Sequence, residues 1–200
     1  VGLFAGLRVS RDAMVQTGGQ YLQDFKLYDF RLLSTLGFTA ADAEAFSKLP
    51  GIREARGSLS QDVLYQTEDG SDLVIAIHTL LPDLNVPDLR AGRMPVSSDE
   101  CVLDAAAFGE DALGTWLTLS ASNDTDTLQL FSHRAYRVVG LADSPIYINF
   151  ERGSTTLGSG SVSCFGYLLP EGFDADYCTE LYLTLENSAP AYSDTYDKLA

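Results

Sequence analysis

Short apolar segments between about residues 82 and 150 constrain the fold of this chain more than any other feature of its sequence. Four candidate strands, ECVLD, TWLTLS, DTLQLF and AYRVVGLA, follow one another at intervals of roughly 10 to 20 residues. Only AAAFGED between them has a helical pattern. Strands spaced in this way pair through short connections, so the stretch is predicted to form a compact β-rich lobe.

The segments before and after this stretch mix strand and helix patterns. FKLYDFRLLSTLG is predicted to be a strand, and TAADAEAFSKLPG a helix with Thr39 as its N-cap. Strands on either side of Asp69-Gly70 are predicted to pair, because this dipeptide is typical of hairpin turns. SVSCFGYLL and TELYLTLE are predicted strands that form a second hairpin. The fold class is therefore predicted to be α+β.

The charge of the chain excludes two classes of partner. Its 13 Lys and Arg residues against 28 Asp and Glu give a formal net charge of -15 at pH 7. Nucleic acids and anionic membrane surfaces both need clustered basic residues, so neither is expected to bind.

The first 22 residues have a pattern that indicates a connection to the membrane. No apolar run reaches the roughly 18 residues that a membrane-spanning helix needs. VGLFAGLR nevertheless reads as the end of a membrane helix, and residues 1–22 as a stalk that follows it. An ordinary amphipathic helix is the alternative.

No set of residues in the sequence has the pattern of a catalytic or metal site. His78 and His133 are the only histidines, and neither lies near another residue at metal-ligand spacing. SNDTDT is predicted to be a solvated hairpin, and GSTTLGSGS, without a following Lys, a flexible surface loop. Glu100 and Asp104 flank the apolar CVL triplet, where charged strand ends commonly meet solvent. We expect no catalytic residues, no metal and no cofactor.

The three cysteines leave one disulfide to consider. Cys101 reads as a small core residue. A bridge between Cys164 and Cys178 is disfavoured, because the predicted hairpin would place Cys164 opposite Thr184 and Cys178 in the turn. The bridge stays open as the minor alternative.

Three motifs in order carry a family resemblance. LRAGRMPVSSDECVLD, then ALGTWLTLS, then AYRVVGLADSP resemble the MacB-type periplasmic core, the extracytoplasmic domain of FtsX-like ABC transporter permeases. LFAGLRVSRDAM, LYDFRLLSTLGFTAADAEAFSKLPGI and SPIYINFERGSTTLGSG are similar to the large permeases of this kind in Gram-positive gut bacteria. Together these pieces cover nearly the whole chain.

The resemblance implies a domain between the first and second membrane helices of a permease in the cell membrane, on the extracellular face. It implies two lobes: a membrane-proximal α/β lobe from residues 1–81 and 151–200, and an inserted β-rich lobe from residues 82–150. The domain would be no enzyme, and would couple ATP-driven movement of the membrane helices to export or to an extracellular protein partner. Its other partners would be the rest of the permease and a separate cytoplasmic ATPase subunit. Residues 1 and 200 are then expected at the same end of the fold.

Within this frame the charged stretch LRAGRMPVSSDE is predicted to be structural. Gly92 permits a tight turn, and Arg93 is expected to pair with Asp99 or Glu100 and to fix the crossing between lobes. Gly140, in the Val-Val-Gly strand, is assigned a structural role as well.

The loop YINFERGSTTLGSGS is predicted to face a partner. Tyr147, Phe150 and Arg152 would supply contact energy, and the glycines would let the loop move. A long turn that joins two strands is the alternative.

Two other functions are alternatives to a permease domain. A receptor or adhesion module for peptide or carbohydrate would use the nine Tyr and Phe residues between Tyr147 and Tyr196, although strand propensity also explains them. An extracellular hydrolase lacks a nucleophile and base in the sequence.

Overall fold

The computed structural model describes residues 25–147 and 151–186 of the 200-residue chain. The predicted stalk within residues 1–22, Phe150, and residues 1 and 200 lie outside the described residues. Within the described ranges, no helix is both long and apolar enough to cross a membrane.

A small antiparallel sheet brings together both ends of the described chain. Its order is β1-β10-β2, with β1 at Phe30–Phe38, β10 at Cys178–Leu185 and β2 at Ile52–Ser58. Helix α2 (Ala40–Ser47) connects β1 to β2. It begins where predicted, because the Thr39 hydroxyl accepts a hydrogen bond from the Asp42 N–H and the Asp42 carboxylate accepts one from the Thr39 N–H.

The remaining strands form a larger sheet that closes on itself. They are β3 (Ser60–Gln66), β4 (Asp72–Thr79), β5 (Asp88–Gly92), β6 (Glu100–Asp104), β7 (Trp116–Leu119), β8 (Ala135–Asp143) and β9 (Cys164–Leu168). The order is β5-β8-β6-β9-β4-β3-β7, and β7 also pairs with β8. This second pairing closes all of these strands except β5 into a barrel, and β5 pairs with β8 outside the ring.

The barrel interior holds the main hydrophobic core. Its buried members come from all six barrel strands and from the loops at one end: Leu59, Val63, Tyr65, Ile75, Ile77, Cys101, Leu103, Leu117, Leu119, Phe131, Tyr136, Val138, Leu141, Cys164, Leu168 and Phe173. All three cysteines of the chain are free thiols. The two sheets and helix α2 confirm the α+β class with two lobes.

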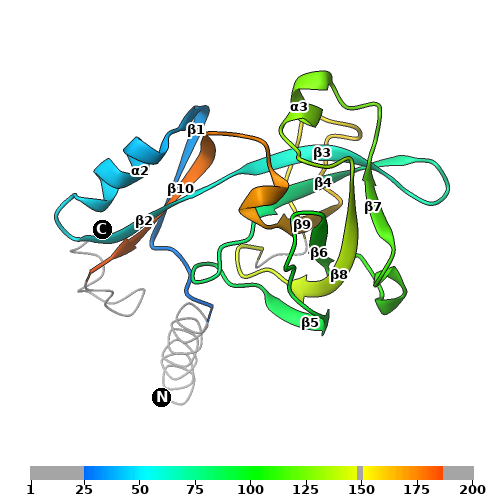
Figure 1. Cartoon of the computed structure of the whole chain (residues 1–200), viewed down its shortest axis with the longest axis horizontal. Helices are drawn as coiled ribbons and strands as arrows, with labels where there is room; N and C mark the ends of the chain where they lie inside the picture. The colour runs from blue at the N-terminus through cyan, green and yellow to red at the C-terminus, as the bar shows by residue number, and fades with distance from the viewer. Residues whose placement is uncertain (1–24, 148–150, 187–200) are drawn as a thin grey trace, which may run out of the picture.

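The two lobes share one nearly continuous strand. β2 ends at Ser58 and β3 begins at Ser60, so only Leu59 separates the small sheet from the barrel. Figure 1 shows the small sheet and α2 on the left, the barrel on the right, and β2 and β3 as one long ribbon between them.

The division between the sheets differs from the predicted lobe boundaries. The sequence grouped residues 60–79 and 164–168 with the lobe built from both chain ends, but these residues form barrel strands β3, β4 and β9. The predicted hairpin of β9 with β10 is therefore wrong. β9 pairs with β4 in parallel and with β6 in antiparallel fashion, whereas β10 pairs with β1 and β2. Such pairings join distant segments, and a local pattern does not encode them.

Two local predictions in the middle of the chain are also wrong. DTLQLF was predicted to be a strand and SNDTDT a hairpin, but Asp124 caps helix α3 (Thr125–Gln129) by accepting a hydrogen bond from the Thr127 N–H at 2.7 Å. AAAFGED is a turn that leads into a single 3-10 turn, η1 (Glu110–Ala112), instead of a helix. The hairpin at Asp69-Gly70 is confirmed, and Gly70 has a φ of 83°.

Candidate functional site at the junction of the two sheets

Buried polar side chains gather where the small sheet meets the barrel. A cavity of about 10 Å³ lies there, lined from both sheets and from the loop after β4. The lining residues are Ser58, His78, Thr79, Leu81, Leu84, Asn85, Ile146, Tyr167 and Tyr182. Protein interiors are mostly apolar, so a polar cluster between two lobes is the first candidate for a functional element.

On the small-sheet side, a buried carboxylate has two partners. Glu180 on β10 has a side chain only 3% exposed and forms an ion pair with Arg31 on β1. Its other oxygen accepts a hydrogen bond from the Tyr182 hydroxyl. Burial, together with Glu180, raises the pKa of Tyr182 well above its usual value. The ring of Tyr182 stacks on Tyr28 with centroids 4.8 Å apart. A buried charge is tolerated only with such partners, so this group is held in place.

On the barrel side, His78 of β4 is buried between two tyrosines. Its ring lies 5.6 Å from the ring of Tyr147 and 5.7 Å from that of Tyr167, and Nε2 is 2.7 Å from the Tyr147 hydroxyl. Burial lowers the pKa of His78 to about 4, with Glu180 acting in the opposite direction and Arg31 in the same direction. His78 is therefore neutral near pH 7, although it lies within reach of charged groups of the small sheet.

Asn85 ties the first described residues to the barrel lobe. Its side-chain amide oxygen accepts a hydrogen bond from the Tyr28 N–H at 3.2 Å, and its backbone N–H donates to the Lys26 carbonyl at 3.0 Å. The Val86 N–H donates to the Phe25 carbonyl at 3.1 Å. Residues 25–28 thus contact the barrel lobe directly before the chain enters β1.

Two polar atoms at the junction have no protein partner among the described residues. These are Nδ1 of His78 and Nδ2 of Asn85, and both side chains line the small cavity. The volume of this cavity is about that of one water molecule. The junction therefore keeps unsatisfied polar atoms and a small void between the two sheets.

Two of the predicted partner-facing residues, Tyr147 and Arg152, lie next to this junction and point inward. Arg152 has a side chain 11% exposed, and its guanidinium donates to both oxygens of Asp104 at 2.7 and 3.0 Å. The guanidinium carbon lies 5.6 Å from the ring centre of Tyr147 and 5.3 Å from that of Phe165. Those two rings stack on each other at 5.0 Å. The structure gives Tyr147 and Arg152 internal contacts, and Phe150 lies outside the described residues.

The three residues assigned a structural role meet at the crossing of β5 and β8. Gly92 has a φ of 74° and pairs with Gly140 across the two strands. A Cβ on Gly92 would lie 2.3 Å from the Val139 carbonyl oxygen. Arg93 pairs with Glu100, which also accepts from the Val96 N–H at 2.9 Å. The bond from Arg93 is the main cause that lowers the pKa of Glu100 to about 2.

The carboxylates at the two ends of β6 therefore have different partners and do not form a pair with each other. Glu100 pairs with Arg93 and Asp104 with Arg152, so each is engaged in its own ion pair. No group of three or more His, Cys, Asp or Glu side chains within residues 25–147 and 151–186 is arranged to hold a metal ion.

The sequence did not single out the junction residues Arg31, His78, Asn85 and Glu180. They come from four separate segments, which only the tertiary fold brings together. One signal was present: Arg31 and Glu180 are charged residues inside otherwise apolar strand patterns, where a buried pair is the usual explanation.

No family model and no curated protein matches the chain. Three solved structures are similar to it. The extracellular domain of the noncanonic ABC-type transporter YknZ from Gram-positive bacteria matches with a TM-score of 0.48 and 13% identity, over 83% of this chain and 80% of that chain. The periplasmic region of MacB from Actinobacillus actinomycetemcomitans matches with a TM-score of 0.46 and 13% identity, over 84% of this chain and 71% of that chain. A permease domain from Porphyromonas gingivalis matches with a TM-score of 0.46 and 16% identity, over 76% of this chain and 65% of that chain. At these identities the likeness concerns the fold alone.

Proposed function

We propose that this chain is a non-catalytic extracytoplasmic domain of an ABC transporter permease, and that the junction of its two sheets passes movement of adjacent membrane segments to the barrel. On this proposal its partners are the rest of the permease and a cytoplasmic ATPase subunit. The proposal agrees with the permease family that the sequence motifs resemble.

One observation carries the proposal. The chain enters and leaves the described fold at the same place, because the Asp29 N–H donates to the Leu183 carbonyl at 2.9 Å and the Leu185 N–H donates to an Asp29 carboxylate oxygen at 2.8 Å. β1 and β10 are neighbours in the small sheet, as Figure 1 also shows. A domain inserted between two membrane helices needs this arrangement, since both connections must return to one membrane surface.

The contacts at the junction support a role in transmission. Residues 25–28 touch the barrel lobe through Asn85, while Thr179 of β10 accepts a hydrogen bond from the Ser60 N–H of barrel strand β3 at 2.8 Å. A movement at the entry or exit of the domain therefore reaches the barrel by two routes besides the β2–β3 strand. Polar contacts with incomplete packing let two bodies shift against each other at lower cost than an apolar core does.

Locking the junction tests the proposal. Arg56 on β2 and Asp83 in the loop after β4 form an ion pair of 3.3 Å between the lobes, and both side chains are about half exposed. The variant Arg56→Cys with Asp83→Cys, in a Cys178→Ser background, would be cross-linked with a short bis-maleimide in the complete transporter. We expect the cross-link to abolish stimulated ATP hydrolysis and transport, and each single-cysteine variant to retain both. Full activity of the locked transporter would contradict the proposal.

The location of the domain has its own test. Asp69 lies at the exposed tip of the β3–β4 hairpin. In intact cells that express the whole protein, Asp69→Cys should react with a membrane-impermeant maleimide as fully as in broken cells. Protection in intact cells would contradict an extracytoplasmic domain.

The receptor alternative loses most of the support that it had in the sequence. Of the aromatic residues after Tyr147 that the structure describes, Phe165, Tyr167, Phe173 and Tyr182 are buried and Tyr177 is half-buried. The four buried rings serve as core and junction residues instead of a ring-stacking surface.

A further inference from the structure

One end of the barrel is hollowed into a pocket of about 320 Å³. Inward-facing side chains of four barrel strands form its floor: Tyr65 of β3, Leu103 of β6, Leu117 of β7 and Val138 of β8. The mouths of β-barrels are common places for small-molecule sites, and pockets for such ligands begin at roughly this size. The pocket lies on the barrel and not at the junction, so the proposed transmission role does not require it.

The pocket exists because small residues cover this end of the barrel. The segment between β6 and β7 contributes Ala107, Gly109 and Ala112 to the lining, and only Phe108 brings a large side chain. Phe108 packs against Tyr65 with ring centres 6.1 Å apart. β7 has only four residues and therefore closes the barrel wall over a short distance.

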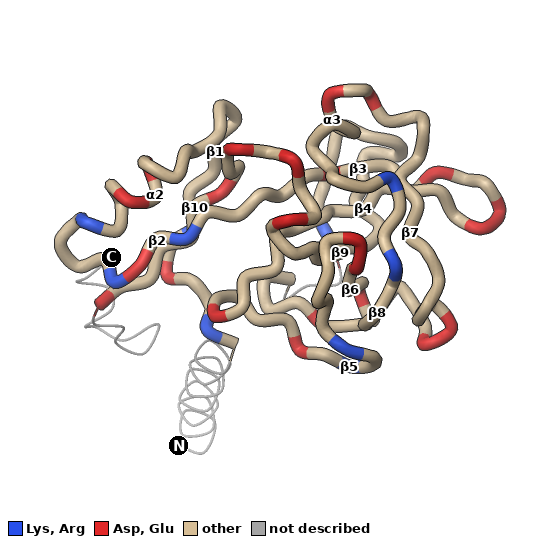
Figure 2. The backbone as a smooth tube through the Cα atoms, in the orientation of Figure 1, with Lys and Arg blue, Asp and Glu red and all other residues tan. Residues whose placement is uncertain are grey.

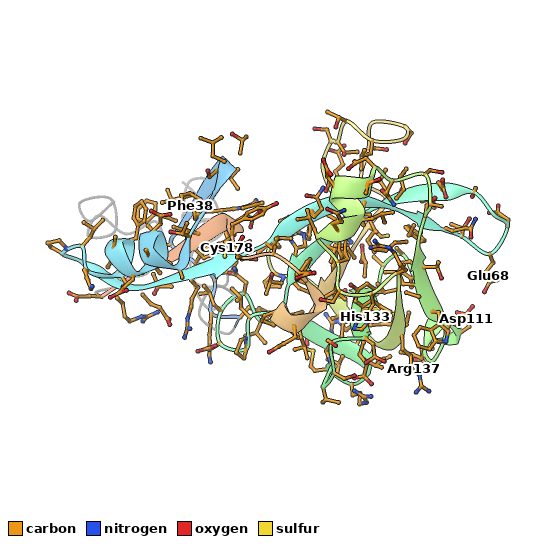
Figure 3. The ribbon with its side chains drawn as sticks, turned by 45° about the horizontal axis from the view of Figure 1, so that its top comes forward. Phe38, Glu68, Asp111, His133, Arg137 and Cys178 are labelled. Atoms are coloured by element: carbon orange, nitrogen blue, oxygen red, sulfur yellow. The ribbon has the colours of Figure 1, made fainter. Side chains whose placement is uncertain are left out.

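The charged side chains of the lining are all acidic. Glu68 from the β3–β4 turn and Asp111 from η1 line the pocket, and no Lys, Arg or His does. Neither carboxylate forms an ion pair within the described part of the chain. Figure 2 shows acidic segments both on the β3–β4 turn and on the segment before β7, and Figure 3 places Glu68 and Asp111 at the same end of the barrel.

Aromatic groups complete the chemistry of the pocket. Tyr65, Phe108 and Trp116 are among the lining residues, and Trp116 is 57% exposed. Aromatic faces attract cations, and apolar side chains bind hydrocarbon. Two carboxylates in a lining that contains no basic residue, in a chain with a net charge of -15, repel anions.

We infer that this pocket binds an organic cation that carries an apolar body, such as an amine, amidine or guanidine attached to a hydrocarbon or aromatic group. The cationic group would lie between Glu68 and Asp111, and the apolar body would contact the floor formed by Leu103, Leu117 and Val138. A bare metal ion does not fit the site, because carboxylates from two separate turns over an apolar floor offer too few oxygen ligands.

Three probes of nearly equal shape isolate the charge. Benzamidinium is cationic, benzamide is its neutral counterpart and benzoate its anionic one. We expect calorimetric titration of the chain to give binding of benzamidinium at least about tenfold tighter than benzamide, and no binding of benzoate. The affinity for benzamidinium should fall as salt rises. Trp116 is the only tryptophan of the chain, so its fluorescence gives a second readout.

Variants assign the effect to the pocket. Glu68→Gln with Asp111→Asn should weaken benzamidinium binding about tenfold and leave benzamide binding unchanged. Glu110→Gln is the matched control, since Glu110 precedes Asp111, is exposed and does not line the pocket. Because the substituted carboxylates are exposed and without ion pairs, the melting temperature should stay unchanged.

Two further probes test whether the natural ligand is a basic peptide or a cationic amphiphile. Acetyl-Phe-Arg-amide represents basic peptides and dodecylammonium represents cationic amphiphiles, and the tighter of the two identifies the source. Equal binding of benzamidinium and benzamide, no binding of any cation, or full binding by the Glu68 and Asp111 variant would overturn the inference. None of these results bears on the junction-locking experiment, so the two proposals can fail independently.

Discussion

The buried ion pair between Arg152 and Asp104 is expected to contribute strongly to the stability of the fold. Asp104 has a side chain only 1% exposed, and Arg152 is its ion-pair partner. We expect Arg152→Ala to lower the free energy of unfolding by about 3–5 kcal/mol, because it leaves a buried carboxylate without a partner. Arg90→Ala is the control: its ion pair with Asp143 is about half exposed and should contribute less than about 1 kcal/mol. Chemical denaturation of the purified chain measures both.

A paired replacement separates lost charge from lost packing. Arg152→Met with Asp104→Leu should retain more stability than Arg152→Ala, since no buried charge remains unpaired. If Arg152→Ala instead costs no more than Arg90→Ala, Arg152 is not held inside. That outcome would favour the sequence-based prediction that Arg152 faces a partner.

His78 makes stability depend on pH. Burial lowers its pKa in the folded chain to about 4, whereas an unfolded histidine titrates near 6.5. As pH falls, the unfolded state therefore binds the proton first, and the stabilisation present above pH 6.5 is lost progressively toward pH 4. The charges of Glu180 and Arg31 on the small sheet shift this pKa in opposite directions. We expect the chain to lose about 2 kcal/mol between pH 7.5 and pH 5.

Two substitutions check this assignment. His78→Gln should remove most of the pH dependence of the unfolding free energy between pH 7.5 and pH 5. His133→Gln, which changes the only other histidine, should leave it intact. A slope that survives His78→Gln would show that another group titrates in this window.

At the scale of elements, the close approach of β5 to β8 depends on glycine. A Cβ on Gly140 would lie 2.3 Å from the Arg93 carbonyl oxygen, so backbone would have to move. We expect Gly140→Ala to lower stability by at least about 1–3 kcal/mol. Gly114→Ala is the comparison, because Gly114 has a φ of 85° but open space around it, and its cost should be about 1 kcal/mol. Equal melting temperatures for the two variants would contradict the steric argument.

The elements that the sequence predicted are those with local causes. Thr39 caps α2 and Gly70 permits the β3–β4 turn, and both effects act within four residues. α3 was missed because Asp124, in a stretch rich in polar residues, was interpreted as part of a solvated hairpin. The hairpin of β9 with β10 failed because β9 is buried on both faces between β4 and β6, a pairing set by distant segments.

Among the candidate sites too, contacts between residues close in sequence were predictable and contacts between distant segments were not. Arg93 was expected to pair with Asp99 or Glu100, and the structure pairs it with Glu100 seven residues away. The junction of Arg31, His78, Asn85 and Glu180 was not predictable, because its members meet only after β10 returns beside β1. The barrel-mouth pocket likewise depends on the pairing of β7 with both β3 and β8, which no local pattern specifies.

In the whole molecule, the small sheet and the barrel are two bodies with more than one connection between them. The small sheet holds the entry and exit of the chain, and the barrel is joined to it by the β2–β3 strand and the polar junction. If the junction transmits movement, the barrel must change its position relative to the small sheet when the transporter binds nucleotide.

Pulsed electron resonance on the complete transporter measures this change directly. One spin label replaces Leu36, which is 96% exposed on the small sheet, and the other replaces Asp69 at the barrel tip, in a Cys178→Ser background. A second pair of labels, at Asp69 and Glu110, has both members on the surface of the barrel lobe and serves as the control. We expect the first distance distribution to shift between the nucleotide-free and ATP-trapped states and the second to stay unchanged. Superimposable distributions for the first pair in both states would contradict it.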